Sequence, residues 1–505
     1  MSLPKIYWLA ERIYKWGKRK LTERSTPIMA ILAMDPNPTE PIQIYLDSKL
    51  KQNTPIYVNG QKEVITYSGH DNLYLCASKH FEPWENIIAF PPNTNIKIIK
   101  LDQLNQPMNR TSNCANWEQL LAHLPENAKA SWFFIINSRN LTPSSLFYGT
   151  YFACYDETFS SYRLNSWVWC SAIVVEAILK EAEDCKDIDT KRQWIGRAED
   201  VGNVLLKRWK TENQQGIGGM VIRWDISYTS ITGIIPWKAP NDISFIGSHC
   251  FIPLFEATGK QKYLHAALEI GRWIVNQGLL SDGRLLVGYR DDLKTWDQNW
   301  LYVDAGFTSS LFAKLFRLTK ENYWKDVLIL FTNWYVGAFF TSSGHFRWMW
   351  PNRFWRSSKK IFTRGQAWAL DGIISAWEVT EEKKYFDVAQ KCIEQLIYQQ
   401  QDDGSWPYLL GIPESGADSK GIPIIAYQII RLVQHVQNPQ IISSAQKALQ
   451  WCQEHQQLKM NDTKSYGGIF FHNIEGSISG QSNISTAFVY SSAYYLMAQK
   501  MKNQQ

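Results

Sequence analysis

Three aspartates stand where apolar helical segments begin, and their side chains could carry acid-base chemistry. They are Asp242 in APNDISFIGS, Asp304 in LYVDAGFTSS and Asp418 in SGADSKGIP. The corresponding place of a fourth segment, IFTRGQAWAL, holds Arg364 and Gln366. A carboxyl group that lies near a second one and is partly removed from water keeps its proton near neutral pH, so such a pair can supply a general acid.

Helix capping is the alternative explanation for each aspartate. Asp is favoured at helix N-termini because it accepts hydrogen bonds from unpaired N–H groups and interacts favourably with the helix dipole. Capping suffices for any one of the three. It is a weaker explanation for Asp242 and Asp304 together if their helices face inward around one ring, because both side chains then reach one opening. The dipole would oppose a raised pKa, so the sequence leaves their protonation open.

The segments that would position these residues repeat along the chain. Residues 361–410 hold a glycine-containing start, an apolar helix, a charged turn, a second helix and a glycine-tryptophan loop. The tyrosines of three such hairpins, Tyr263, Tyr323 and Tyr385, lie 60 and 62 residues apart (323 − 263 and 385 − 323). One helical hairpin cannot bury enough apolar surface alone, so recurring hairpins predict a helical array.

The pattern predicts a mainly α fold: an (α/α)6 toroid of helical hairpins with an N-terminal β-rich or α/β segment. Inner helices are expected at 164–181, 241–257, 303–318, 364–379, 419–434 and 484–499, and outer helices at 190–209, 260–277, 321–338, 382–399 and 438–456. The N-terminal part must supply a twelfth helix to close the ring. Five glycine loops, GIGGM, SDGRLL, SSGHFRW, DDGSWPY and YGGIFF, should emerge at one end of the array and carry function.

Composition divides the chain into three parts. We expect a basic amphipathic helix over 1–25, a small β-rich or α/β segment over 42–145, and the barrel with the catalytic residues over 150–505. The middle part contains short β-branched or aromatic runs: IQIYL, PIYVNG, EVITYS, NLYLCA, NIKIIKL and WFFIIN. It contains no phosphate-binding loop or dinucleotide fingerprint.

The positive charge is concentrated at the N-terminus. The first 24 residues carry seven Lys/Arg against two Glu, which accounts for +5 of the net charge of +6. The nearly neutral remainder predicts that the body of the protein does not bind nucleic acid. The N-terminal stripe of Trp8, Leu9, Ile13 and Trp16 could contact an anionic membrane or a protein through residues 1–24, although a docked or solvated helix is the alternative.

Localisation is predicted to be cytoplasmic, with a possible peripheral position at the inner membrane surface. Charged residues interrupt the N-terminal apolar run, whereas the apolar region of a signal peptide is continuous. No stretch reaches the roughly 20 apolar residues of a membrane span. The eight cysteines show no CxxC pairing, which favours reduced thiols over a sulfur-ligated metal site.

One segment carries a family resemblance. TRGQAWALDGIISAWEVT followed by KYFDVAQ resembles the signature of the unsaturated glucuronyl hydrolases (glycoside hydrolase family 88) and the related rhamnogalacturonyl hydrolases of family 105. In these enzymes an RGQ-W-G inner helix precedes a T-G-D-x-Y-x-x-x-A outer helix. DISF with FEATGKQKYLHAA, and VDAGF with FRLTKENY, look like the two preceding units of this six-hairpin superfamily. The resemblance covers 160–500 in outline and is strongest over 240–410.

The resemblance implies roles for four residues. Asp304 would be the catalytic general acid and base, and Asp242 the second carboxylate. Gln366 would contact substrate, and Arg364 would order the start of its helix. The spacing agrees with this alignment, since Asp242 to Asp304 and Asp304 to Gln366 are both 62 residues (304 − 242 and 366 − 304).

Further substrate contacts are expected in the loops. Asn241, also expected to contact substrate, stands where the family usually has a histidine. His345 corresponds to a later family histidine. Trp237, Trp348 and Trp406 could stack on sugar faces, although packing is the alternative for each. Cations near these positions are Arg364, Lys238, Arg347 and Lys420.

The implied reaction is hydration of the C4–C5 double bond of an unsaturated uronic acid at the end of an oligosaccharide, without a metal or an organic cofactor. One alternative is a sugar epimerase, which in related barrels relies on paired histidines. We place few of the nine histidines in loops, namely His249, His345 and His472. The other alternative is a non-hydrolytic glycan-binding or assembly protein of surface-polysaccharide metabolism.

Overall fold

The computed structural model describes short strands in the N-terminal hundred residues and most of the chain beyond 117. The described ranges are 29–33, 42–46, 56–58, 61–63, 65–67, 73–76, 85–89, 98–103, 117, 120–140, 149–157, 161–162, 167–221, 237–291, 293–298, 300–351, 361–436, 438–458, 464–473 and 484–502. The amphipathic helix expected over 1–25 lies outside them.

The N-terminal strands form two four-stranded antiparallel sheets. One has the order β1-β7-β3-β4 and the other β5-β6-β2-β8. Their bounds are β1 Met29–Ala33, β2 Ile42–Leu46, β3 Ile56–Val58, β4 Gln61–Glu63, β5 Ile65–Tyr67, β6 Leu73–Cys76, β7 Glu85–Ala89 and β8 Ile98–Gln103. Strands therefore occur in the runs from IQIYL to NIKIIKL, as the sequence predicted.

The prediction of a strand at WFFIIN is wrong, because this run forms the C-terminal half of a helix, α3 (Glu126–Asn137). A short apolar run fits a strand and a buried helix equally well, so its neighbours decide. Here ENAKAS precedes it, Glu126 lies in the first turn, and Trp132, Phe134 and Ile135 are buried. Part of the segment assigned to 42–145 thus belongs to the helical body.

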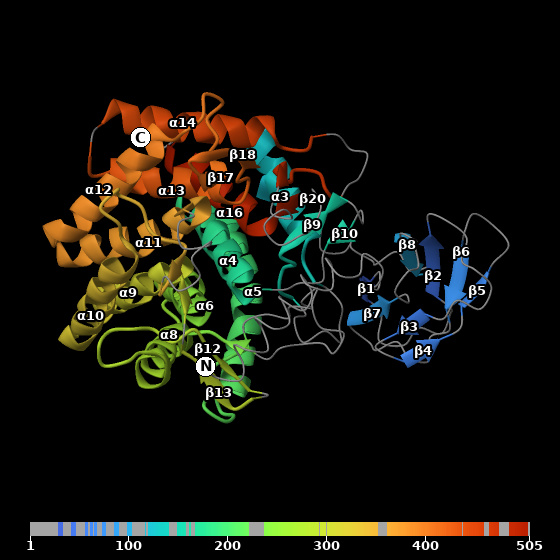
Figure 1. Cartoon of the computed structure of the whole chain (residues 1–505), viewed down its shortest axis with the longest axis horizontal. Helices are drawn as coiled ribbons and strands as arrows, with labels where there is room; N and C mark the ends of the chain where they lie inside the picture. The colour runs from blue at the N-terminus through green and yellow to red at the C-terminus, as the bar shows by residue number, and fades with distance from the viewer. Residues whose placement is uncertain are drawn as a thin grey trace.

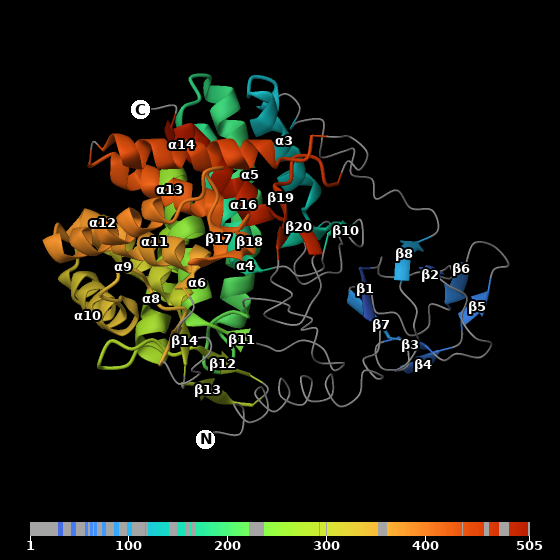
Figure 2. The ribbon, with the colours of Figure 1, turned by 45° about the horizontal axis from the view of Figure 1, so that its top comes forward.

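Inner and outer helices alternate along the chain and close a ring (Figures 1 and 2). The inner helices are α4 (Val168–Glu183), α6-η3-α7 (Pro240–Ile246, Gly247–Phe251, Ile252–Thr258), η5-α9 (Val303–Phe307, Thr308–Thr319), α11 (Thr363–Thr380), α13 (Gly421–Val433) and α16 (Val489–Lys502). Each packs on the next, and α16 packs back on α4. The predicted toroid is confirmed. No helix in the described ranges is long and apolar enough to cross a bilayer.

The outer layer is completed by α3. Five outer helices follow their inner partners: α5 (Ile188–Glu212), α8 with its π turn η4 (Gln261–Trp273, Ile274–Gly278), α10 (Asn322–Phe339), α12 (Lys383–Tyr398) and α14 (Pro439–Glu454). The sixth, α3, packs on α16, the inner helix furthest from it in sequence. The expectation that the N-terminal part supplies the twelfth helix is therefore confirmed.

Short strands lead into most inner helices. Their bounds are β9 Cys154–Asp156, β10 Ser161–Tyr162, β11 Trp237–Lys238, β12 Gly288–Arg290, β13 Thr295–Asp297, β14 Leu301–Tyr302, β15 Met349–Trp350, β16 Ile361–Phe362, β17 Pro407–Leu410, β18 Ile412–Ala417, β19 Phe470–Asn473 and β20 Ile484–Phe488. Because β20 occupies 484–488, the last inner helix begins at Val489, later than predicted. We call this strand-lined end of the ring, where the inner helices begin, the mouth.

The turn between inner and outer helix has the same threonine hydrogen bond in three units. Thr258, Thr319 and Thr380 lie 61 residues apart (319 − 258 and 380 − 319), and each hydroxyl donates to the carbonyl four residues earlier. The buried aromatic that follows is Tyr263, Trp324 or Tyr385, also 61 residues apart (324 − 263 and 385 − 324). Tyr323, predicted as the anchor of its unit, is instead 46% exposed.

The glycine loops join each unit to the outer helix of the next. Gly283, Gly344, Gly404 and Gly467 all have φ between 85° and 88°. A Cβ at Gly404 would lie 2.4 Å from the Lys447 carbonyl oxygen in α14, and one at Gly467 would lie 1.7 Å from that of Ala130 in α3. The chain therefore needs glycine here both for the left-handed backbone and for close contact with the next helix.

Replacing Gly467 by alanine tests the docking of α3. The added methyl group overlaps the Ala130 carbonyl, so α3 must shift in addition to the left-handed strain of roughly 1–2 kcal/mol. Gly411→Ala is the matched control, since Gly411 also has positive φ, at 78°, but no atom within 4 Å of its ideal Cβ. We expect Gly467→Ala to lower the thermal unfolding midpoint clearly more than the control. Equal midpoints would contradict the docking.

Candidate functional site

Asp242 and Asp304 enter the mouth from neighbouring units. Asp242 lies in the first turn of α6 and Asp304 in the 3-10 turn η5, and both side chains are half-buried. The helix α6 packs against η5 and α9. One turn further in, the Ser244 hydroxyl donates to Thr308 Oγ1 at 3.3 Å. The two carboxylates therefore lie at the same end of adjoining helices.

Neither aspartate is the N-cap of its helix. The N-cap residues are Ala239 for α6 and Tyr302 for the turn η5, and neither has a capping side-chain hydrogen bond. Both carboxylates lie further inside the first turn, where the helix dipole still favours negative charge. Neither aspartate therefore acts as an N-cap, although the helix dipole still favours the negative charge of both.

The turn that carries Asp304 is held from two sides. The Tyr335 hydroxyl donates to the Val303 carbonyl at 2.6 Å. Burial, and to a lesser degree the Asp304 charge, raises the pKa of Tyr335 well above its ordinary value, so this donor keeps its proton. A Cβ on Gly372 would lie 1.9 Å from the Gly306 carbonyl, so glycine lets the backbones of α11 and η5 touch. Asp304 is thereby fixed in place by its neighbours.

Asp418 is tied to Arg364 and does not join the other two acids. Its carboxylate is fully buried, accepts the Arg364 backbone N–H at 3.2 Å and lies 3.5 Å from Arg364 Nη1. The guanidinium of Arg364 lies 4.3 Å from the centroid of the Phe362 ring and 5.4 Å from that of Tyr408. Arg364 therefore orders the start of α11 and compensates a buried charge.

Gln366 was expected to contact substrate, but in the structure its side chain binds the backbone of the loop after α10. Its side chain is fully buried. The amide accepts the Phe346 N–H at 2.8 Å and donates to the Phe346 carbonyl at 2.8 Å and the Phe362 carbonyl at 3.2 Å. Because the backbone occupies both ends of the amide, Gln366 fastens the loop after α10 to the start of α11.

His345 and Trp406 also point into the protein. His345 lies with Nε2 at 2.9 Å from the Gln399 side chain at the end of α12, and burial lowers its pKa. Trp406 is fully buried and donates from Nε1 to the Leu396 carbonyl in α12 at 2.7 Å. Both pack against an outer helix, so the sugar contacts expected of them are replaced by structural roles.

The other two predicted tryptophans belong to a row of aromatic rings. Trp237, Trp300, Tyr302 and Trp348 are all half-buried, and we call them the aromatic row. Successive ring centroids lie 6.5, 4.5 and 6.3 Å apart. The sequence analysis missed Trp300 and Tyr302, although the motif NWLYVDAG places them four and two residues before Asp304.

The remaining polar candidates have partners within the protein. Lys238 is buried and lies 2.9 Å from Asp291, and the Lys420 ammonium lies 4.1 Å from the Phe488 ring centroid. Asn241, beside Asp242, is buried, and its backbone carbonyl accepts a hydrogen bond from the Ser244 hydroxyl at 2.5 Å.

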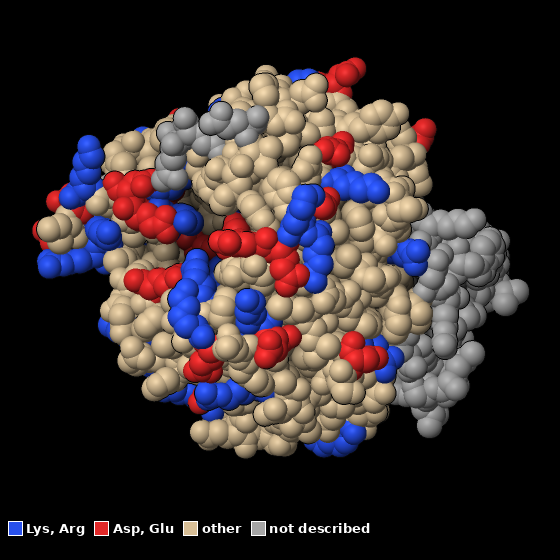
Figure 3. All heavy atoms as spheres, turned by 90° about the vertical axis from the view of Figure 1, so that its left-hand side faces the viewer, with Lys and Arg blue, Asp and Glu red and all other residues tan. Residues whose placement is uncertain are grey.

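On the face shown in Figure 3, acidic and basic side chains are interspersed around a hollow. That face lacks the one-sign basic surface that nucleic acid would require.

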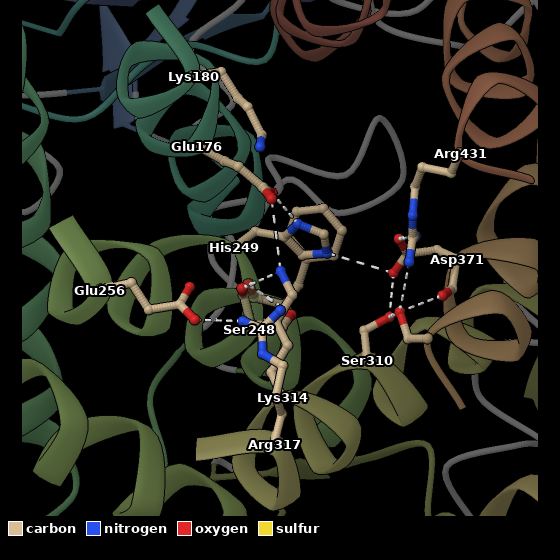
Figure 4. Close-up of polar contacts among 12 residues, drawn as sticks. Glu176, Lys180, Ser248, His249, Glu256, Ser310, Lys314, Arg317, Asp371 and Arg431 are labelled. Carbon is tan, nitrogen blue, oxygen red and sulfur yellow. Dashed lines mark hydrogen bonds and ion pairs between the residues drawn. The ribbon is translucent and has the colours of Figure 1, made fainter. Parts of the chain in front are cut away.

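A second polar group lies deeper in the ring (Figure 4). We call Glu176, His249, Ser310, Asp371 and Arg431 the axial cluster, since each comes from a different inner helix. His249 Nδ1 is hydrogen-bonded to Glu176, and its Nε2 lies 3.5 Å from Asp371 Oδ2. Asp371 also accepts from the Ser310 hydroxyl and, at 2.9 Å, from Arg431 Nη1. Five inner helices thus meet in one buried network.

The charges of the axial cluster compensate one another. Burial would raise the pKa of Glu176, but Lys314 and His249 outweigh it and lower that pKa to about 2. Burial would likewise lower the pKa of His249, but the Glu176 and Asp371 carboxylates raise it above its ordinary value. Asp371 keeps a depressed pKa because His249 and Arg431 overcome its burial. The two carboxylates therefore favour the protonated form of the buried His249 side chain.

The axial cluster is separated from the mouth by aromatic rings. The Phe245 ring stacks on His249 with centroids 3.9 Å apart and meets Phe307 edge-on at 5.0 Å. His249, predicted in a loop, instead lies in the π turn Gly247–Phe251 of an inner helix. Such turns insert one residue per turn and often mark functional sites. No group of three or more His, Cys, Asp or Glu suited to a metal ion occurs within the described chain.

Comparisons with known proteins support the fold and a carbohydrate link. The family model described as glycosyl hydrolase family 76 matches residues 169–350, a stretch that includes Asp242 and Asp304. A search of curated proteins gives no match. The chain is thus similar over about a third of its length to a family of glycosyl hydrolases.

Solved structures share the architecture at low sequence identity. The unsaturated glucuronyl hydrolase from Bacillus sp. GL1 is 13% identical, with a TM-score of 0.57, covering 76% of this chain and 95% of that one. The Streptococcus agalactiae enzyme of the same name is 12% identical, with a TM-score of 0.56 and coverages of 80% and 97%. Cellobiose 2-epimerase from Bacillus thermoamylovorans B4167 is 12% identical, with a TM-score of 0.56 and coverages of 77% and 99%. This chain therefore shares the (α/α)6 fold of these structures.

Neutralising one carboxylate of the axial cluster should strongly destabilise the protein. Glu176→Gln leaves the buried His249 and Lys314 with one counter-charge fewer, a change that typically costs roughly 3–5 kcal/mol. Glu183→Gln is the control on the same helix, because its surface pair with Lys180 should contribute less than about 1 kcal/mol. Chemical denaturation measures both free energies of unfolding, and similar losses would contradict the charge network.

Stability should also depend on the protonation of His249. Its raised pKa stabilises the fold fully below the ordinary value of 6.5, and this contribution disappears as pH rises through the raised value. The depressed pKa of Glu176 contributes above 4.5 and is lost as pH falls toward 2. We therefore expect the thermal midpoint of the protein to exceed that of His249→Gln most between 4.5 and 6.5. A gap that widens in alkaline buffer would refute this.

Proposed function

We propose that this protein is a glycoside hydrolase-like enzyme that hydrates the C4–C5 double bond of an unsaturated uronic acid at the end of an oligosaccharide. The observation that carries the proposal is the placement of Asp242 and Asp304, half-buried on helices that touch at the mouth. Two such carboxylates can divide acid and base roles between them. The resemblance of the RGQ-W-G segment to families 88 and 105 supplies the reaction type.

In this proposal Asp304 moves the proton. Its carboxyl group protonates C4 of the double bond, and the carboxylate that results takes a proton from water as the water oxygen bonds to C5. Asp304 thereby regains its proton, and the net change is the addition of one water molecule. The hemiketal formed at C5 then opens to a ketone and leaves a hemiacetal at C1. Collapse of this hemiacetal to an aldehyde breaks the glycosidic bond and releases the next sugar as an alcohol.

Asp242 supplies the second carboxylate. It lies on the adjoining helix, so it can hold the attacking water or a sugar hydroxyl while Asp304 acts. The fixed turn around Asp304, held by Tyr335 and by the glycine contact of Gly306 with Gly372, favours such a role because catalytic groups need a preorganised position. Gln366, His345 and Trp406 take no part in it, since each is occupied inside the protein.

Hydrolysis of an ordinary glycosidic bond is the second candidate. It is favoured by the match to glycosyl hydrolase family 76, which spans both aspartates. The same pair of carboxylates would then protonate the leaving oxygen and activate water. The two reactions differ in what they consume: hydration removes the ultraviolet absorbance of the conjugated double bond, whereas glycosidic hydrolysis of a saturated chain releases reducing ends without that loss.

Epimerisation has less support from the histidines. Of the histidines predicted in loops, His249 lies below the Phe245 ring in the axial cluster and His345 packs against α12. His249 contacts Glu176 and Asp371, and His345 contacts Gln399, so the two histidines do not form a pair with each other. The likeness to cellobiose 2-epimerase concerns the fold, which hosts several reactions. Glycan binding without turnover remains the alternative to any enzymatic activity.

Asp304→Asn tests the proposed reaction. The amide cannot donate and regain a proton, so turnover of unsaturated uronides should fall by roughly 10²–10⁴-fold or more. Asp402→Asn is the control, because Asp402 is exposed in the glycine loop after α12. Loss of ultraviolet absorbance measures the rate, and circular dichroism checks that both variants fold. Full activity in Asp304→Asn would remove that residue from the mechanism.

A further inference from the structure

The aromatic row uses tryptophan differently from the core. The tryptophans that hold the helices together, among them Trp194, Trp209, Trp324 and Trp451, are fully buried. Trp237, Trp300 and Trp348 are only half-buried. Packing explains the first set, whereas the second packs against the core and also keeps part of each residue exposed. An aromatic surface of this kind is typical of a site that binds a partly apolar ligand.

The row is held in place by the short strands of two successive units. Pairing of β11 with β12 sets Trp237 opposite Arg290, and its indole covers Gly288, where a Cβ would come within 2.2 Å of Nε1. Glycine at this position thus makes room for the ring. Pairing of β14 with β15 joins Tyr302 to Met349, the residue next to Trp348. Because strand pairing holds the backbone at Trp237 and Tyr302, these two positions have little backbone freedom left to lose on binding.

Two rings of the row lie close in sequence to the two acids. Trp237 is five residues before Asp242, and Tyr302 is two residues before Asp304. The rings follow one another at 6.5, 4.5 and 6.3 Å, so the row is continuous from one unit to the next. A ligand that used all four rings would need several flat apolar faces in series, each with polar edges that stay hydrated.

We propose that the aromatic row is a binding platform for a chain of sugar units, so that the preferred substrate is a long oligosaccharide or a polysaccharide end and not a disaccharide. Pyranose rings have the required shape, with apolar C–H faces and a polar rim. This inference rests on the proposed function for the position of the reacting sugar, and it adds the length of the substrate to it.

Binding as a function of chain length tests the platform. Unsaturated di-, tetra- and hexasaccharides from lyase digestion of a glucuronic acid polysaccharide are titrated calorimetrically into Asp304→Asn, which should not consume them. We expect the hexasaccharide to bind at least roughly tenfold more tightly than the disaccharide, the gain expected from one or two added stacking contacts. Equal affinities across the series would overturn the platform even if turnover is observed.

Substitutions in the row locate the effect. In the same background, Trp300→Ala should weaken hexasaccharide binding by roughly tenfold and disaccharide binding less, while Trp300→Phe keeps a ring and retains most of the affinity. Tyr398→Ala, at a residue 84% exposed at the end of α12, is the control and should change nothing. Circular dichroism melting checks that Trp300→Ala folds. Unchanged hexasaccharide affinity in that variant would overturn the platform.

Failure of the platform and failure of the proposed function give different results. If unsaturated uronides are turned over but affinity does not depend on chain length, the reaction stands and the platform falls. If hexasaccharides bind more tightly than disaccharides through Trp300 but no uronide is consumed, the platform stands and the hydration reaction falls.

Discussion

Compensation of buried charge on the axis of the ring is the constraint on which the rest of the structure depends. Glu176, His249, Asp371 and Arg431 lie in the interior, where an ion without a partner costs several kcal/mol. Their partners come from different inner helices, so each helix must keep its height and rotation for the network to close. Apolar packing alone is less selective, because side chains can exchange neighbours at similar energy.

The height and rotation of the inner helices decide which side chains reach the mouth. Phe245 stacks on His249 and lies three residues after Asp242, so the axial cluster fixes the helix that carries the first acid. The second acid is fixed from α10 and α11, through Tyr335 and the contact between Gly306 and Gly372. Asp242 and Asp304 are therefore placed by elements that lie outside the mouth, which allows the loops around it to vary without moving the carboxylates.

The comparisons fit this division between scaffold and site. Structures of a glucuronyl hydrolase and of a sugar epimerase share the ring at 12–13% identity, so the ring itself does not select a reaction. Selection depends on the side chains at the mouth. In this chain the proposed site combines two carboxylates with the aromatic row, and the proposed reaction depends on them.

The sequence by itself determined the architecture and the position of the acids. The recurrence of amphipathic hairpins, whose tyrosines lie 60 and 62 residues apart, and the missing twelfth helix predicted a closed ring, because a lone hairpin leaves its apolar stripe exposed. Asp242 and Asp304 followed from the same recurrence, since equivalent helix starts meet at one end. These features depend on local period and spacing, which are written directly in the chain.

Only the tertiary structure decided where individual side chains point. A run as short as WFFIIN fits a strand or a helix equally well. Its helix is stabilised by packing on α16, more than 350 residues away in sequence. Gln366, His345 and Trp406 matched a functional pattern, yet backbone groups and outer helices take up their polar atoms. The axial cluster has no sequence motif, because its five members lie far apart in the chain and are brought together only when the ring closes.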